Sequence, residues 1–199
     1  MTKPRLGLSA TLAASLAACA DPRPDVVLET AMGEVVIEVD TEKAPASAGD
    51  FLRYVDEGLY DGQAFYRTVT PATDPRDMGM SLVQGGRADL LPVGPYVPLE
   101  TTGATGLSNT EGSVALARTL PAEGSAAFFF VNLGDNTFLD QGGTRNPDGF
   151  GYAVFGRVVD GMDTLRAIQF QATAPDPNGI FAGDQKIAEP VEIVRAYRK

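Results

Sequence analysis

Short strand-like runs separated by turn-forming residues recur along most of this chain, and this pattern limits the possible fold more than any other feature. Runs rich in β-branched and aromatic residues are typical of strands. They occur at residues 26–30, 34–39, 64–69, 81–84, 113–117, 127–132, 152–159 and 190–197. Amphipathic helix spacing is found between Pro45 and Gly58 and again from Gly161 to about Phe170. Eight strands with only two helices predict a mainly β fold with an antiparallel, largely closed sheet.

The N-terminus has the pattern of an export signal. Lys3 and Arg5 precede a small apolar run, residues 6–18, that is too short to span a membrane. The run ends in Leu-Ala-Ala-Cys, which resembles the lipobox of bacterial lipoproteins, and Cys19 is the only cysteine of the chain. The resemblance implies that residues 1–18 are a lipoprotein-type signal peptide and that Cys19 carries a lipid.

These features divide the chain into three parts. Residues 1–18 are the expected signal peptide, residues 19–25 a short polar tether, and residues 26–199 a single folded domain. We therefore expect an exported protein that is anchored through Cys19 on the periplasmic face of a bacterial membrane. A plain signal peptide that is cut near Ala18 or Ala20, leaving a soluble periplasmic protein, is the alternative.

Composition excludes several kinds of chemistry. The chain has no histidine, which removes the commonest general base and the commonest metal ligand, and a single cysteine cannot form an intrachain disulfide. We expect no metal and no cofactor, since the acidic loop 133–140 does not have EF-hand spacing. The net charge of −10 repels phosphate, so nucleic acid is not an expected partner.

One charged residue stands out in an apolar setting. The strand-like run FYRTV has Arg67 between strand formers, and strict alternation would place Phe65, Arg67 and Val69 on one face. Two interpretations are open. Arg67 either lies at an edge position or extends its stem along an apolar surface to reach water, or it works on the wall of an apolar pocket.

The order of several motifs resembles the cyclophilin family of peptidyl-prolyl isomerases, in particular its bacterial members. The matching stretches cover nearly all of residues 26–197. They are VVLETAMGEVVIEV, KAPASAGDFLRYVDEGLYDGQAFYR, VQGG, SNTEGSVALART, FFFVNLGDNTFLD and GYAVFGRVVDGMDTL. The resemblance implies a closed eight-stranded antiparallel barrel that is capped by two helices, with its active site on the outer surface of the barrel.

The resemblance also assigns site residues. It implies that Arg67 is the essential arginine and that Gln84 of the QGG motif is the second catalytic residue. It places the substrate-binding residues at Phe65, Leu82, Ala117, Arg118, Phe128, Phe130, Phe138, Leu139 and Tyr152. Phe130 would form the floor of a proline pocket, and Phe138, Leu139 and Tyr152 would form its rim. Proline-containing polypeptides are the implied partners, and the protein is expected to be a monomer.

These residue types suit rotation about an X–Pro bond. Twisting the amide breaks its resonance against a barrier of about 20 kcal/mol, and no covalent bond forms or breaks. A fixed donor that is aimed at the twisted amide stabilises that state more than the planar ones. Arg67 offers such a donor because a guanidinium is rigid and stays protonated, and an apolar pocket strengthens it.

The chain departs from the family pattern at three places. The phenylalanine and methionine that usually precede QGG are replaced by Ser81 and Leu82, which thins one predicted wall of the proline pocket. Phe128 stands where the family usually has a glutamine. The turn before QGG is lengthened to residues 70–80, which leaves open whether this loop covers the groove or supplies Met78 or Met80 as a new wall.

Three functions compete at this stage. The first is an active prolyl isomerase that helps extracytoplasmic proteins to fold. The second is a weakly catalytic cyclophilin-like module that binds proline-containing segments or an envelope partner, as the altered positions Ser81 and Phe128 suggest. The third is an unrelated β-barrel with a small molecule inside it.

Overall fold

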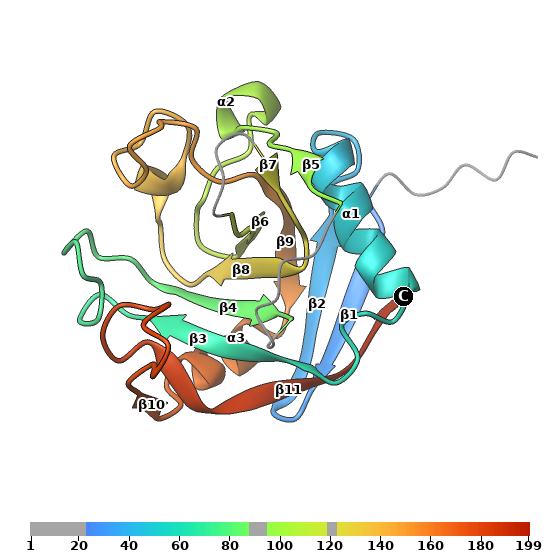
Figure 1. The fold of residues 1–199 in the computed structure, drawn as a ribbon. Helices are drawn as coiled ribbons and strands as arrows, with labels where there is room; N and C mark the ends of the chain where they lie inside the picture. The colour runs from blue at the N-terminus through green and yellow to red at the C-terminus, as the bar shows by residue number, and fades with distance from the viewer. Residues whose placement is uncertain (1–22, 88–94, 119–122) are drawn as a thin grey trace, which may run out of the picture.

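The main sheet of the domain is a closed antiparallel barrel. The computed structural model describes residues 23–87, 95–118 and 123–199, so the predicted signal peptide and Cys19 lie outside the described residues. Within this part, eight strands follow one another around the barrel in the order β1-β2-β9-β6-β8-β4-β3-β11, and β11 pairs with β1 to close it (Figure 1). Their bounds are β1 Asp25–Thr30, β2 Gly33–Val39, β3 Gln63–Val69, β4 Leu82–Gly86, β6 Ser113–Leu116, β8 Phe128–Asn132, β9 Val154–Asp160 and β11 Lys186–Arg198.

The two predicted helices correspond to α1 (Pro45–Asp56) and α3 (Met162–Gln169). α1 packs against β9 and β11, and α3 packs against β2, β3 and β4 on another side of the barrel (Figure 1). A third helix, α2 (Thr102–Thr105), was not predicted because its sequence, TGAT, has no apolar periodicity. Shorter elements are β5 (Val97–Pro98), β7 (Glu123–Gly124), β10 (Thr173–Ala174) and a 3₁₀ turn at Thr137–Leu139. No helix in the described part of the chain is long and apolar enough to cross a membrane.

Aromatic side chains fill the interior of the barrel. Phe129 of β8 makes edge-to-face contacts with Phe51 of α1, Tyr60 and Phe65, with ring centroids 5.4–5.8 Å apart. Phe155 of β9 packs on Phe51 at 4.9 Å. All five side chains are fully buried. Because side chains occupy the interior, the hypothesis of a small molecule inside the barrel is wrong.

A second apolar cluster lies on the outer surface of the same strands. It consists of Val69, Met80, Leu82, Ala115, Phe130, Leu139 and Val154. Strand alternation explains the division, since Phe129 faces inward to the core while Phe130 faces outward to this cluster. Met80, Leu82, Phe130 and Leu139 of this outer cluster line a pocket on the surface of the barrel.

A bulge in β3 changes which side chains point outward. Phe65 pairs with Gly85 and Arg67 pairs with Gln84, so Tyr66 is the extra residue of a β-bulge. The expected alternation across FYRTV is therefore wrong: Phe65 points into the core, whereas Tyr66 and Arg67 both face the outer pocket. Gly85 makes room for this arrangement, because a Cβ there would come within 2.8 Å of the Phe65 ring.

Candidate active site

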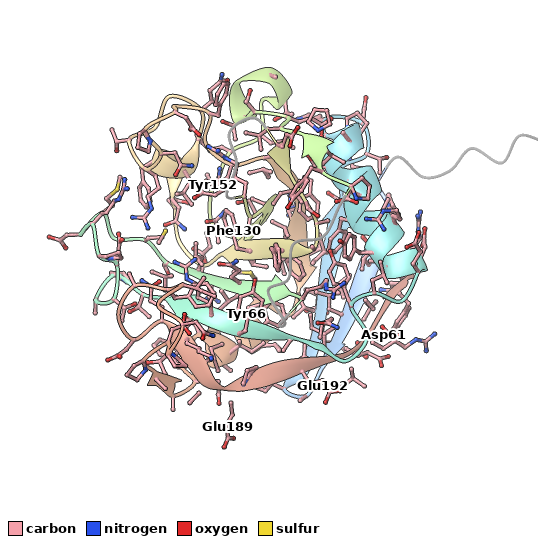
Figure 2. The ribbon with its side chains drawn as sticks, in the orientation of Figure 1. Asp61, Tyr66, Phe130, Tyr152, Glu189 and Glu192 are labelled. Atoms are coloured by element: carbon pink, nitrogen blue, oxygen red, sulfur yellow. The ribbon has the colours of Figure 1, made fainter. Side chains whose placement is uncertain are left out.

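A pocket of about 320 Å³ opens on the outer face of the barrel over β3, β4 and β8. Figure 2 shows the labelled Tyr66, Phe130 and Tyr152 gathered here, whereas Glu189 and Glu192 of β11 project away from the barrel. The pocket is lined by most of the predicted site residues, namely Arg67, Leu82, Gln84, Ala117, Arg118, Phe128, Phe130, Leu139 and Tyr152. The strand pairing of β3, β4 and β8 thus brings residues from distant parts of the sequence to one place.

Arg67 is half-buried in the pocket and is held by neutral groups. Its Nη1 donates to Oε1 of Gln84 at 2.8 Å, and its Nε and Nη2 donate to Oε1 of Gln185 at 3.0 and 2.7 Å. Phe181 lies over the guanidinium, with its ring centroid 5.1 Å from Cζ. A guanidinium has five N–H donors, so one N–H on each Nη atom is left for a ligand.

The charge of Arg67 has no carboxylate partner among the residues that the structure describes. Burial lowers the pKa of the Arg67 guanidinium below its ordinary value, but an arginine remains protonated throughout the physiological range. The site therefore presents a fixed positive charge with free donors in a pocket that is mostly apolar. A neutral acceptor such as an amide oxygen or nitrogen can accept from these donors and leave the positive charge in place.

Gln84 is fixed in turn by Tyr66. Its Nε2 donates to the Tyr66 hydroxyl at 3.0 Å, which sets the orientation of the amide so that Oε1 faces Arg67. The Tyr66 ring stacks on Phe181, with centroids 6.0 Å apart. Burial raises the pKa of the Tyr66 phenol, which is therefore neutral at ordinary pH. Tyr66, Gln84, Arg67 and Phe181 form one connected group.

The apolar side of the pocket is a hollow beside this group. Phe130 is buried and meets the Tyr152 ring edge-on, with centroids 5.4 Å apart. Leu82, Leu139 and Met80 complete the hollow. A small, rigid, apolar ring such as that of proline fits a hollow of this composition, and the free donors of Arg67 lie in the wall of the same pocket.

Comparison with known proteins identifies the family. The family model described as cyclophilin type peptidyl-prolyl cis-trans isomerase matches residues 25–198. The chain belongs to this family. A peptidyl-prolyl cis-trans isomerase of Streptomyces antibioticus is 36% identical over 174 residues, which cover 86% of this chain and 96% of the relative. Peptidyl-prolyl cis-trans isomerase B of Escherichia coli is 35% identical over 150 residues, 74% of this chain and 85% of the relative.

A solved structure has the same fold. The crystal structure of a cyclophilin type peptidyl-prolyl cis-trans isomerase from Cryptosporidium parvum superposes with a TM-score of 0.67 at 19% sequence identity. It covers 89% of this chain and 98% of its own length. The barrel of this chain therefore has the fold of a cyclophilin.

Met80 answers one question that the sequence left open about this cyclophilin. It is buried and lines the pocket, so it takes up the wall that Ser81 does not supply. Ser81 instead accepts a hydrogen bond from Nε2 of Gln169 at 2.9 Å. Met78 does not line the pocket.

Two predicted substrate-binding residues are not part of the pocket lining. Phe65 is fully buried in the barrel core because the bulge at Tyr66 reverses its direction, so its assignment to the site is wrong. Phe138 packs against the outer cluster from the 3₁₀ turn but does not line the pocket. Leu139, the next residue, takes the rim position that was predicted for both.

Arg118 lies at the rim but its charge is already paired. It binds Asp148 through two hydrogen bonds of 2.8 Å and donates from Nε to the carbonyl of Gly151 at 2.6 Å. Hydrogen bonds from Arg118 lower the pKa of Asp148 to about 2. Its guanidinium also lies 5.4 Å from the centroid of the Tyr152 ring. Arg118 thus shapes the rim and supports Tyr152.

The segment before β11 contributes two side chains that lie outside the family motifs. Gln185 and Phe181 come from a stretch rich in turn-forming residues, DPNGIFAGDQ, which predicts only a loop. The final strand was expected from residue 190 but begins at Lys186, directly after Gln185. No local pattern marks Gln185, and only the pairing of Lys186 with Arg67 places it at the site.

The long loop 70–80 is tied to both sides of the pocket. Asp74 accepts hydrogen bonds from the backbone N–H groups of Arg76, Met78 and Met80 and pairs with Arg145 at 3.2 Å. Arg145 itself lines the pocket. Since loop 70–80 is anchored at the rim and supplies Met80, it forms part of the wall.

Across residues 23–87, 95–118 and 123–199, no cluster of acidic, cysteine or histidine residues is placed to hold a metal ion.

Proposed function

We propose that this peptidyl-prolyl cis-trans isomerase acts on proline-containing segments of extracytoplasmic proteins and assists their folding. The observation that carries the proposal is the contact set of Arg67. A guanidinium that is held by two neutral amides beside an apolar hollow is suited to an amide substrate.

The proposed reaction needs no covalent step. The prolyl ring enters the hollow over Phe130 between Leu139 and Met80, which holds one side of the X–Pro bond still. As the bond twists, resonance is lost and the prolyl nitrogen regains its lone pair. A free N–H of Arg67 donates to the twisted amide more strongly than to either planar form, so the twisted state is stabilised selectively.

Gln84 keeps the donor in place during the twist. Its Oε1 accepts from Arg67, and its Nε2 is already held by Tyr66. The amide therefore does not have to reorganise as the substrate charge shifts, which is how preorganised polar groups lower a barrier.

Exchange spectroscopy on a proline-containing peptide tests the proposal directly. We expect catalytic amounts of the wild-type protein to accelerate exchange between the cis and trans resonances of an Ala-Pro tetrapeptide. The competing function is a weakly catalytic module that binds proline-containing segments or an envelope partner, which Phe128 in the lining favours because it replaces an amide by an apolar ring. Peptide binding without faster exchange would establish that alternative and overturn the enzymatic proposal.

The extracytoplasmic setting is a separate part of the proposal and is supported by the sequence alone. Lys3, Arg5, the apolar run over 6–18 and Cys19 have the order of a lipoprotein signal. We propose that Cys19 anchors a monomeric domain on the periplasmic face of a membrane. Wild-type protein should incorporate a labelled fatty acid and remain with membranes, whereas Cys19→Ser should do neither. Equal labelling of the two proteins would show that Cys19 does not carry the lipid.

A further inference from the structure

The buried Gln185 holds Arg67 on the side away from Gln84. It stands directly before β11, it is fully buried, and its Oε1 accepts from both Nε and Nη2 of Arg67. Gln84 accepts from Nη1. Two acceptors on different nitrogens define the plane of a guanidinium, whereas one acceptor leaves it free to swing.

Gln185 is itself fixed at two points besides its contact with Arg67. Its Nε2 donates to the carbonyl of Thr73 at 2.8 Å, and its backbone carbonyl accepts from the N–H of Thr68 at 2.8 Å. Its Oε1 is thereby oriented toward Arg67 by loop 70–80 on one side and by β3 on the other. The amide orientation is determined by this set, because an exchange of oxygen and nitrogen would bring N–H groups together at Arg67 and two acceptors together at Thr73.

The choice of an amide at this position matters for the charge. A glutamate would accept the same two N–H groups but would neutralise Arg67. Glutamine holds the guanidinium and leaves its positive charge available to the substrate. Phe181, which lies 5.1 Å from Cζ, covers the guanidinium without pairing with it.

From this geometry we propose that Gln185 is a positioning residue for catalysis. It fixes the guanidinium plane so that the remaining N–H groups on Nη1 and Nη2 are held toward a bound X–Pro amide. The proposal rests on the isomerase function of the pocket. It adds a residue that lies outside the motifs shared with the cyclophilin family. It also gives loop 70–80 a part in the site, through the carbonyl of Thr73.

Gln169 offers a matched control for the experiment. It is also a buried glutamine, and its Nε2 donates to the carbonyl of Val69 and to the Ser81 hydroxyl at the two ends of loop 70–80. It does not line the pocket, and no hydrogen bond joins its side chain to Arg67 in the described part of the chain. Replacing either glutamine by leucine removes a comparable set of buried bonds from the same loop.

We expect Gln185→Leu to lower kcat for a proline peptide by about tenfold to a hundredfold with KM changed less than about threefold, because a displaced donor is lost mainly in the transition state. Gln169→Leu should lower stability but change kcat by less than about twofold. Gln185→Asn keeps a polar side chain but is one methylene too short to reach Arg67, so its kcat should fall as in Gln185→Leu. This variant keeps the test valid if Gln185→Leu does not fold. Equal losses in the Gln169 and Gln185 variants, or wild-type kcat in Gln185→Asn, would overturn the proposal.

A second readout separates this proposal from the proposed function. The Nε–H proton of Arg67, followed by ¹⁵N NMR, should exchange slowly with water in the wild type and in Gln169→Leu. It should exchange faster in Gln185→Asn. If the wild type proves inactive, the isomerase function falls, and this resonance still shows whether Gln185 holds Arg67. Unchanged exchange of the Nε–H in Gln185→Asn would refute the positioning.

Discussion

At the scale of single residues, the site holds a positive charge that no opposite charge compensates within the part of the chain that the structure describes. Arg67 is bound by the side-chain amides of Gln84 and Gln185 and is covered by Phe181. Ion pairs do occur at the rim, where Arg118 pairs with Asp148 and Arg145 with Asp74. The rim arginines thus serve the structure, and the arginine in the pocket keeps its donors for a substrate.

Tyr66 supplies the first prediction at this scale. Tyr66→Phe keeps the ring that stacks on Phe181 but removes the hydroxyl that accepts a hydrogen bond from Nε2 of Gln84. The Gln84 amide can then rotate away from Arg67. We expect kcat/KM to fall about fivefold, the effect of one net hydrogen bond of about 1 kcal/mol. Burial raises the pKa of Tyr66, so the phenol stays neutral from about pH 6 to pH 9. The ratio of kcat/KM between variant and wild type should therefore be constant over this range.

A second tyrosine gives the control for this measurement. Tyr60 is also buried, and its hydroxyl donates to the carbonyl of Ala126 in the barrel core. Tyr60→Phe removes a buried phenol bond without touching the pocket, so it should lower stability and leave kcat/KM within about twofold. A Tyr66→Phe enzyme as active as wild type would show that Gln84 does not need this support.

At the scale of elements, the unusual feature is loop 70–80 and its attachment across the pocket rim. Asp74 is at the centre of the loop, its side chain is completely buried, and Arg145 comes from the facing loop. Burial by itself would raise the pKa of Asp74, but N–H groups of Met80, Arg76 and Met78 and the charge of Arg145 outweigh it. The pKa of this carboxyl therefore lies below its ordinary value.

This depressed pKa makes the stability of the loop depend on pH. The stabilisation is complete above the unfolded pKa of about 3.9 and is lost as pH falls through the lower folded value. We expect Asp74→Asn to reduce the free energy of unfolding by about 2–4 kcal/mol at pH 7, where a buried ion pair is broken. The difference in unfolding free energy between wild type and Asp74→Asn should narrow toward pH 2, because the carboxyl gains its proton more readily in the unfolded than in the folded protein below about pH 3.9. Urea unfolding at the two pH values measures both quantities.

Asp77 in the same loop provides the comparison. It is exposed and adopts a positive φ of 51°, a conformation that asparagine tolerates well. Asp77→Asn should change the unfolding free energy by no more than about 0.5 kcal/mol at either pH. If the difference in unfolding free energy between wild type and Asp74→Asn is the same at pH 7 and pH 2, the effect does not come from the Asp74 charge.

The elements also show which parts of the structure could be predicted from the sequence. Strands with regular alternation, such as β8, were predictable because Phe129 and Phe130 face opposite sides as the pattern requires. The direction of Phe65 was not, because a bulge is set by pairing with Gly85 and Gln84 on another strand. The four-residue α2 has no apolar spacing, so the sequence contains no signal for it.

At the scale of the whole molecule, closure of the barrel assembles the site. β3, β4 and β8 are neighbours, and the pairing of β11 with β3 brings Gln185 beside Arg67 although 118 residues separate them. Motif resemblance identified Arg67, Gln84 and Phe130 because these lie in recognisable stretches. It could not identify Gln185 or Phe181, because their place depends on how the last strand closes the sheet.

The central claim is that a rigid guanidinium, and not merely a positive charge, lowers the barrier to twisting an X–Pro bond. Arg67→Lys tests it most directly, because lysine keeps the charge but cannot contact Gln84 and Gln185 through a planar fork. Exchange spectroscopy on one proline tetrapeptide would give the catalysed rate for wild type, Arg67→Lys and the control Arg166→Lys, whose exposed side chain lies on α3 away from the pocket. We predict that Arg67→Lys loses about a hundredfold in catalysed exchange while peptide affinity changes less than about threefold, and that Arg166→Lys matches wild type. Wild-type exchange in Arg67→Lys would contradict the account.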